Sequence, residues 1–344
     1  MKTNYLLIGL ALAGLTASCS KDKDSDITYS DKAISFTAAV PQTTTRALTE
    51  GVTTTSTLNN FRVYSFVEGE TTPFMNGVEV NKTGNLWTYT PVQFWPVGKT
   101  LNFYAYSPQI VTNTAAEGNI GMDSKNPDIP GFINGYKTDL LYAVNMDQAY
   151  SQTTQVKINF RHALARLSFK FKAKEDQSIK VKISNVNLVN TMSVADFKFP
   201  RESTTDFDIT KAVGKWNNHK TPTDMLINSV ASDFIGSQPV LLMSAGNQFV
   251  LPQEVKQASE REQNGVYLRI NATIYDADSQ LQVWPREGQS DDIYVPIKAT
   301  DNQWKLGYLY AYTISVGVPD NEGWIQFDQN VTVDEYGNID EPLP

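Results

Sequence analysis

Cys19 is the only cysteine of this 344-residue chain, and its thiol stands where it could receive a lipid. The small residues Thr16-Ala17-Ser18 precede it and follow an apolar run, residues 5–15. That run is too short to span a bilayer as a helix and, with Lys2 before it, is typical of a signal peptide. The segment resembles a bacterial lipobox, although Thr16 stands where leucine is more usual. We expect residues 1–18 to be a lipoprotein signal peptide and Cys19 to become a palmitate-bearing anchor in the outer membrane; an incidental cysteine is the alternative.

Few side chains are placed for catalysis. The chain has two histidines, His162 and His219, and neither lies at a metal-ligand spacing. We expect His162 to cap or pack near the middle of the chain. Paired carboxylates could flank a sugar in a surface glycosidase, but solvated loop acids are the simpler interpretation of each pair: Asp206/Asp208, Asp276/Asp278 and Asp291/Asp292. We therefore expect no enzyme, catalytic residue, metal or cofactor, and a glycosidase is the least favoured of three hypotheses.

Aromatic residues offer a different chemistry. Tyr308, Tyr310 and Tyr312 alternate along one expected strand, so they lie on one face of it. Such a face could stack on sugars, which keeps open a second hypothesis, a permanently anchored surface lipoprotein that binds glycans. Packing in a core is the simpler interpretation of the same ladder. The six tryptophans are scattered along the sequence and define no platform.

Hydrophobic periodicity predicts the fold class. Apolar and polar residues alternate with period two from end to end, whereas helical periodicity is scarce. The alternation predicts an all-β protein of antiparallel sheets with one solvated side. Strands are expected at 34–38, 61–66, 101–106, 140–144, 156–160, 167–172, 179–184, 266–275 and 306–318. The formal net charge is -8 and the basic residues form no stripe, so we expect no nucleic-acid partner.

The length predicts two domains. About 326 residues remain after the signal peptide, more than one core usually serves. Residues 161–166 favour helix and interrupt two strong strand patterns, so we place the domain junction there. The expected parts are a tether with a first strand at 19–46 and two β-sandwiches at 47–165 and 166–344. The Gly- and Pro-rich segment 113–135 is expected to be a long surface loop.

Several motifs in order resemble the fimbrillin family, the type V pilus subunits and related surface lipoproteins of Bacteroidales-type bacteria. The motifs span nearly the whole mature chain: Phe94-Trp95-Pro96, 101–108, 139–143, 156–165, 249–253 and 304–314. The resemblance implies two tandem transthyretin-like β-sandwiches. It also implies a fimbrial subunit or adhesin at the cell surface, whose partners are other fimbrial subunits and a glycan or protein ligand.

The same resemblance gives Arg46 a meaning. In the family, an Arg-directed protease cuts at this point, which here is the Arg46-Ala47 bond, and removes the first strand with its lipid. A strand from another subunit then replaces it. A linker arginine with no such role is the alternative. The C-terminal segment offers a candidate donor strand with Ile325, Phe327, Val331 and Val333, but the tail is short, so a tip or accessory subunit stays as open as a stalk subunit.

Overall fold

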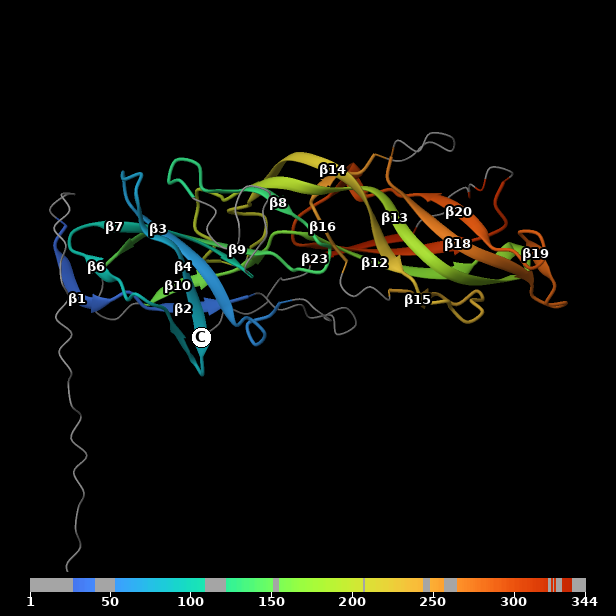
Figure 1. Ribbon diagram of the computed structural model, residues 1–344, viewed down its shortest axis with the longest axis horizontal. Helices are drawn as coiled ribbons and strands as arrows, with labels where there is room; N and C mark the ends of the chain where they lie inside the picture. Colours follow the sequence, from blue (N-terminus) through green and yellow to red (C-terminus); the bar gives the residue numbers. More distant parts are fainter. Residues whose placement is uncertain are drawn as a thin grey trace, which may run out of the picture.

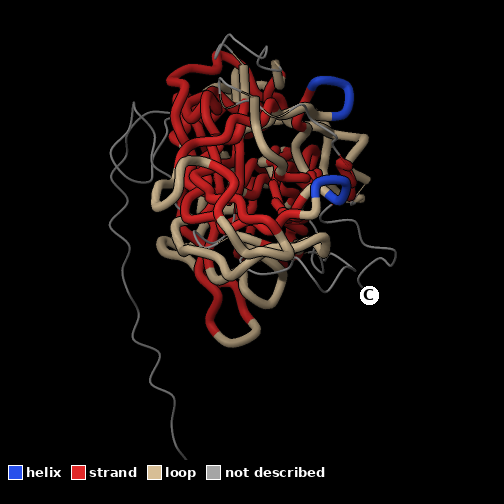
Figure 2. The backbone as a smooth tube through the Cα atoms, turned by 90° about the vertical axis from the view of Figure 1, so that its right-hand side faces the viewer, coloured by secondary structure: helices blue, strands red, loops and turns tan. Residues whose placement is uncertain are grey.

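The computed structural model describes residues 27–40, 53–108, 122–150, 155–206, 208–243, 248–256, 265–320, 323 and 325, and the backbone of 330–335. In these ranges the regular elements are β-strands and two short 3-10 helices, η2 (Glu175–Gln177) and η3 (Thr300–Asn302), which lie at the margin of the strands in Figure 2. The all-β prediction is confirmed. No helix among the described residues is long and apolar enough to cross a membrane.

One antiparallel sheet dominates the N-terminal end of the molecule (Figure 1). Its strands follow the order β11-β9-β7-β3-β4-β5, with these bounds: β11 (Arg161–His162), β9 (Leu141–Ala149), β7 (Thr100–Ser107), β3 (Asn60–Val67), β4 (Pro73–Thr83) and β5 (Leu86–Thr88). Facing it are two short strand pairs. The first joins β1 (Tyr29–Ala33) to β6 (Phe94–Pro96), and the second joins β2 (Phe36–Ala39) to β10 (Val156–Asn159).

The central strands of the N-terminal sheet, β3 and β7, are buried on both faces, which differs from the expected solvated side; β4 and β5 at its edge keep exposed residues. In β3, Phe61 and Val63 belong to the core under β1 and β2, whereas Tyr64 and Phe66 point to a second core toward the middle of the molecule. The run 101–106 in β7 is apolar at nearly every position for the same reason, since alternate residues serve the two cores.

The C-terminal end is a sandwich of two sheets around a separate core. One sheet has the order β15-β12-β22-β23, with β16 also paired to β12: β15 (Val240–Leu241), β12 (Ala165–Ala173), β22 (Tyr308–Val316), β23 (Asn330–Glu335) and β16 (Gln248–Val250). The other has the order β14-β13-β18-β19: β14 (Lys215–Asn228), β13 (Ile179–Lys198), β18 (Tyr267–Asp276) and β19 (Gln282–Trp284). Beside it, β20 (Asp291–Pro296) pairs with β18, and β17 (Gln253–Glu254) pairs with β21 (Gln303–Trp304). The pair β12–β22 is parallel, as is β2–β10, so the sheets are not wholly antiparallel as expected.

The two ends share a middle core. The far half of β13 reaches back over the N-terminal sheet, where Ala195 and Phe197 pack with Tyr104 and Tyr142. A short strand, β8 (Asp128–Ile133), pairs with this part of β13, so the expected surface loop 113–135 was wrong for 128–133. The segment 161–166 is fully buried and forms β11 and the start of β12, not the helix-favouring break its residues indicated. The division of the chain into domains there stays a prediction.

Candidate functional site

Residues 27–40 run as one extended segment between β6 and β10, and we call the space they occupy the strand slot (Figure 1). On one side β1 pairs antiparallel with β6, with Tyr29 opposite Pro96 and Ala33 opposite Phe94. On the other side β2 pairs parallel with β10. Backbone hydrogen bonds continue past the strand ends, since the N–H groups of Val156 and Phe160 donate to Ser35 O and Ala39 O at 2.8 Å each.

Alternate side chains of this segment point into the N-terminal core. Ile34 and Phe36 are each 2% exposed, and Val40 is 0% exposed. The Phe36 ring meets Phe61 edge-on with a centroid distance of 5.9 Å and Phe103 in the same manner at 5.9 Å. The first strand therefore forms part of the core that its removal would open.

The connection after this segment contains Arg46 and Ala47, which lie outside the described residues, as does Cys19. Its two flanks are bonded to each other, because Val40 N–H donates to Thr55 Oγ1 at 2.9 Å and the Thr55 hydroxyl donates to Val40 O at 3.0 Å. Noncovalent contacts thus join the end of the first strand to the chain on the far side of the connection.

A buried pair fixes the downstream flank. His162 Nδ1 lies 2.9 Å from Asp139 Oδ1, and both side chains are 1% exposed. The second oxygen, Asp139 Oδ2, accepts a hydrogen bond from Thr53 N–H at 2.8 Å. His162 therefore packs and bonds inside the protein, in agreement with the structural role inferred for it from the sequence.

Replacing Asp139 by alanine should lower the free energy of unfolding by about 3 kcal/mol, because a buried imidazole and a backbone N–H would both lose their acceptor. Urea unfolding followed by tryptophan fluorescence measures this change. Asp139→Asn, which keeps one side-chain oxygen as acceptor, should lose clearly less. A change below about 1 kcal/mol in Asp139→Ala would show that the pair does not hold this flank.

The candidate donor residues are docked on their own chain. Ile325 is 7% exposed in the C-terminal core, and its N–H donates to Tyr294 O at 3.1 Å. In β23, Val331 lies opposite Tyr312 and Val333 opposite Tyr310 of β22. Phe327 lies outside the described residues. Among these positions, the described ones are paired or buried and not free.

The tyrosine ladder is mostly internal. Tyr310 and Tyr312 are each 1% exposed, and the Tyr312 hydroxyl accepts a hydrogen bond from Trp304 Nε1 at 2.8 Å. Burial raises the pKa of Tyr310 to about 12. The core interpretation of these two residues is the one the structure supports, and only Tyr308 is partly open to solvent.

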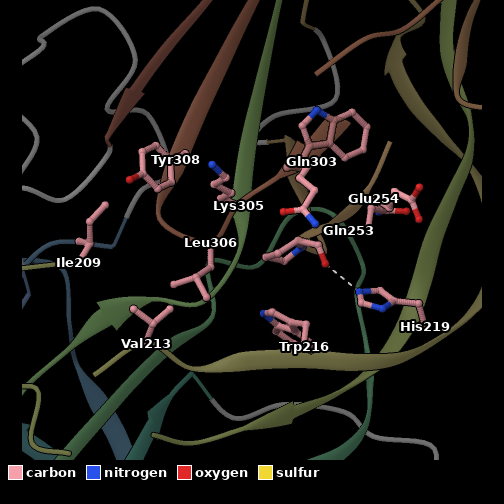
Figure 3. A pocket seen from close by; sticks show the side chains of 12 residues that line it. Ile209, Val213, Trp216, His219, Gln253, Glu254, Gln303, Lys305, Leu306 and Tyr308 are labelled. Carbon is pink, nitrogen blue, oxygen red and sulfur yellow. Dashed lines mark hydrogen bonds between the residues drawn. The ribbon is translucent and has the colours of Figure 1, made fainter. Parts of the chain in front are cut away.

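Tyr308 lines a pocket of about 390 Å³ beside β14 and β21 (Figure 3). Val213 and Leu306 form an apolar side, and Trp216 and His219 of β14 lie next to each other across from them. His219 Nε2 donates to Pro252 O at 2.7 Å. Because the Trp216 indole donates its Nε1 hydrogen to Ala163 O at 2.6 Å and packs on Phe197, this ring is committed to the protein. No specific contact here supports a sugar platform.

The paired acids have structural contacts. Asp206 and Asp208 form ion pairs with Lys211, and the Asp276 carboxylate accepts hydrogen bonds from Ser279 within a turn. Asp292 accepts a hydrogen bond from the Asn271 amide at 3.0 Å. No group of three or more His, Cys, Asp or Glu side chains in the described ranges could hold a metal ion.

Sequence reasoning did not find the partners of the first strand. β6 and β10 lie about 60 and 120 residues from β2 in the sequence. No local sequence pattern predicts pairings over such separations, among them the parallel pairing of β2 with β10. The alternation of Ile34, Phe36 and Val40 was the one available signal that this segment has a buried face.

Comparison with known proteins agrees with this architecture. A fimbrial protein from Bacteroides vulgatus ATCC 8482 is 16% identical, with 88% of this chain and 99% of that chain aligned and a TM-score of 0.53. A candidate cell adhesion protein from Parabacteroides distasonis ATCC 8503 is 11% identical, with 90% of this chain and 98% of that chain aligned and a TM-score of 0.51. At these identities the likeness shows the fold alone. No curated protein matches the chain in sequence.

The family is shown by sequence. The model of fimbrillin-like proteins matches residues 45–334, which is most of the chain. The fimbrillin-like family consists of fimbrial, cell-surface subunits whose role is structural and not catalytic. The chain belongs to the fimbrillin-like family.

Proposed function

We propose that this chain is a fimbrial subunit that is exported as a lipoprotein, cut between Arg46 and Ala47, and joined to other subunits by strand exchange. Cys19 carries the precursor to the outer membrane, and the cut frees the mature chain from its lipid. The observation that supports this most is the single extended segment 27–40 inserted between β6 and β10. Two tandem transthyretin-like sandwiches, 47–165 and 166–344, are our proposal for the mature chain.

Cleavage turns the first strand into a separate peptide. While the connection 41–52 is intact, the strand stays at a high effective concentration beside its slot; once cut, it is diluted when it dissociates. Its departure would take the acceptors from the N–H groups of Val156 and Phe160 and expose the rings of Phe61 and Phe103. Unpaired strand edges and exposed aromatic surface both favour pairing with another chain.

The C-terminal segment has the side chains to replace the first strand. Ile34, Phe36 and Val40 are spaced i, i+2 and i+6, which places them on one face of a strand. The C-terminal segment repeats both the residue types and the spacing: Ile325, Phe327 and Val331. A second copy could therefore offer the same three apolar groups in the same order.

This register also matches charge. Thr37 lies opposite Lys157 in the β2–β10 pair, and Lys157 is exposed. With Phe327 in the place of Phe36, Asp328 would take the place of Thr37 and face Lys157. Opposite charges across neighbouring strands stabilise a pair by about 0.2–1 kcal/mol, so the exchanged strand would gain an interaction that the first strand lacks.

Exchange has a cost that suits a regulated assembly. The donor must withdraw Ile325 from the C-terminal core and open the pairing of Asn330 and Val331 with Thr313 and Tyr312. In the precursor the slot is occupied and the donor is docked, so neither half of the new interface is available. Removal of the first strand vacates the slot, and the contacts that the donor makes on filling it offset this cost.

Cleavage of the detergent-solubilised precursor with an Arg-specific protease tests the proposal. The expected product begins at Ala47 and forms multimers on size exclusion with light scattering, whereas Arg46→Gln stays uncut at this bond and monomeric. A cut chain that remains monomeric but binds a synthetic peptide of residues 324–335 would be an acceptor only, as expected of a tip subunit. A cut chain that neither multimerises nor binds the peptide would refute strand exchange.

A further inference from the structure

A basic pocket lies beside the middle core, and none of its described lining residues belongs to β1, β2, β6 or β10. It has a volume of about 750 Å³ and is bounded by the segment before β8, the end of β13 and the loop that leads into β14. Glu202 is the one carboxylate among its described lining residues. Five cations line it: Lys125, Lys198, Arg201, Lys211 and Lys215. We infer that this pocket binds an acidic polysaccharide.

The concentration of positive charge is local. The whole chain has a net charge of -8, so five cations around one pocket run against the overall balance. Lys125 and Lys215 are exposed and form no ion pair with any described residue. Lys211 is partly neutralised by Asp206 and Asp208, at 3.3 and 3.2 Å. Lys198 is also partly neutralised, since it attracts the carboxylates of Asp128 and Asp196. Lys125 and Lys215 therefore carry the positive charge that an anionic ligand would complement.

Two arginines hold the lips of the pocket in place. Arg201 donates one hydrogen bond to Ser124 O at 2.6 Å and another to Lys125 O, which fixes the lip that carries Lys125. On the opposite lip the buried Arg161 donates to Lys211 O and, through its other terminal nitrogen, to Asp206 Oδ1 at 3.2 Å. Lysines mounted on fixed backbone lose less entropy when a ligand binds, which favours a preformed site.

The shape and lining favour a sugar polymer. Pro200 adds apolar surface among the cations, together with the edges of the largely buried Pro127 and Phe199. The Thr210 hydroxyl donates to Asp208 Oδ1 at 2.5 Å and keeps its oxygen as an acceptor for a ligand. Sugar rings present both C–H faces and hydroxyls, and an acidic polymer brings repeated charges that can meet cations on both lips. A single small anion would use only a fraction of a pocket of about 750 Å³. The cell-surface location of the family gives such a polymer access to the site.

Binding of the full-length chain to defined oligosaccharides tests this inference. At physiological ionic strength, calorimetry should detect a sulfated heparin hexasaccharide or a carboxylated oligogalacturonate but not a neutral dextran fragment, and the two acidic probes separate sulfate from carboxylate recognition. Affinity should fall as salt rises, because bound counterions are released. In Lys125→Gln/Lys215→Gln the dissociation constant should rise about tenfold for the preferred probe.

The matched control is Lys99→Gln/Lys256→Gln, which removes the same charge from exposed lysines outside the pocket and should change the constant by less than about twofold. Equal losses in both double variants, or no binding of either acidic probe by the parent chain, would overturn the inference. Tighter binding of a single-stranded DNA of equal charge would overturn the choice of a polysaccharide. Because these lysines lie outside the strand slot, the result is independent of whether cleavage drives assembly.

Discussion

Replacing Phe36 by alanine is expected to lower the free energy of unfolding of the uncut chain by about 4 kcal/mol, within the range for truncating a buried aromatic side chain to alanine. Phe36 is 2% exposed and packs edge-on against Phe61 and Phe103. Its loss leaves a cavity in a core that the first strand closes from one side only. The change is measured by urea unfolding of purified precursor.

Thr37→Ala is the matched control because Thr37 lies next to Phe36 in β2 but is exposed. It should change the free energy of unfolding by less than about 0.5 kcal/mol. If Phe36→Ala also lowered the free energy of unfolding by less than about 1 kcal/mol, the first strand would contribute little to the N-terminal core. Its removal could then not expose an apolar slot that binds another strand.

Phe327→Ser is expected to abolish multimer formation after cleavage at Arg46. In the proposed register Phe327 fills the space that Phe36 leaves, and serine cannot fill it. Losing about 3 kcal/mol or more of apolar contact weakens each subunit junction at least about 100-fold. Light scattering at micromolar protein after complete cleavage measures the effect.

Gln326→Ser is the control in the same segment, since Gln326 corresponds to Ser35 and would lie on the opposite face of the donated strand. Its multimers should match those of the parent chain. Full assembly of cut Phe327→Ser would show that another segment donates the strand or that the slot takes no strand from its own kind.

Strand positions could be read from the sequence wherever alternation was unbroken. The expected strands 61–66, 101–106 and 266–275 correspond to β3, β7 and β18. Only the first third of β13 was expected, at 179–184, because irregular pairing between Ile183 and Asn185 shifts which residues face the core. The strand β8 was missed because Pro130 and Gly131 indicate a loop, although Gly131 N–H is satisfied by Asp196 Oδ1 at 2.7 Å.

The functional residues divide in the same way. Cys19 and Arg46 could be proposed from local motifs and the family resemblance, and the buried face of the first strand from its alternation. The slot itself depends on β6 and β10, and the basic pocket joins Lys125 to Lys215, so both require pairings between distant parts of the chain. Sequence patterns report which face of a strand is buried, but not which strand lies beside it.

The measurement that tests strand exchange most directly is disulfide trapping between copies. Cut chains carrying Lys157→Cys are mixed with cut chains carrying Asp328→Cys; cleavage at Arg46 removes Cys19, the one natural cysteine, so the introduced thiols are the only ones present. Neighbouring strands lie about 4.8 Å apart, within disulfide reach, whereas pairing Lys157→Cys with Asn330→Cys shifts the thiols two residues out of register. We predict oxidised heterodimers for the first mixture, with positions 157 and 328 linked in peptide mass spectra, and none for the second. Multimers that form without this cross-link, or that cross-link only in the shifted pair, would contradict the exchange of segment 325–331 into the strand slot.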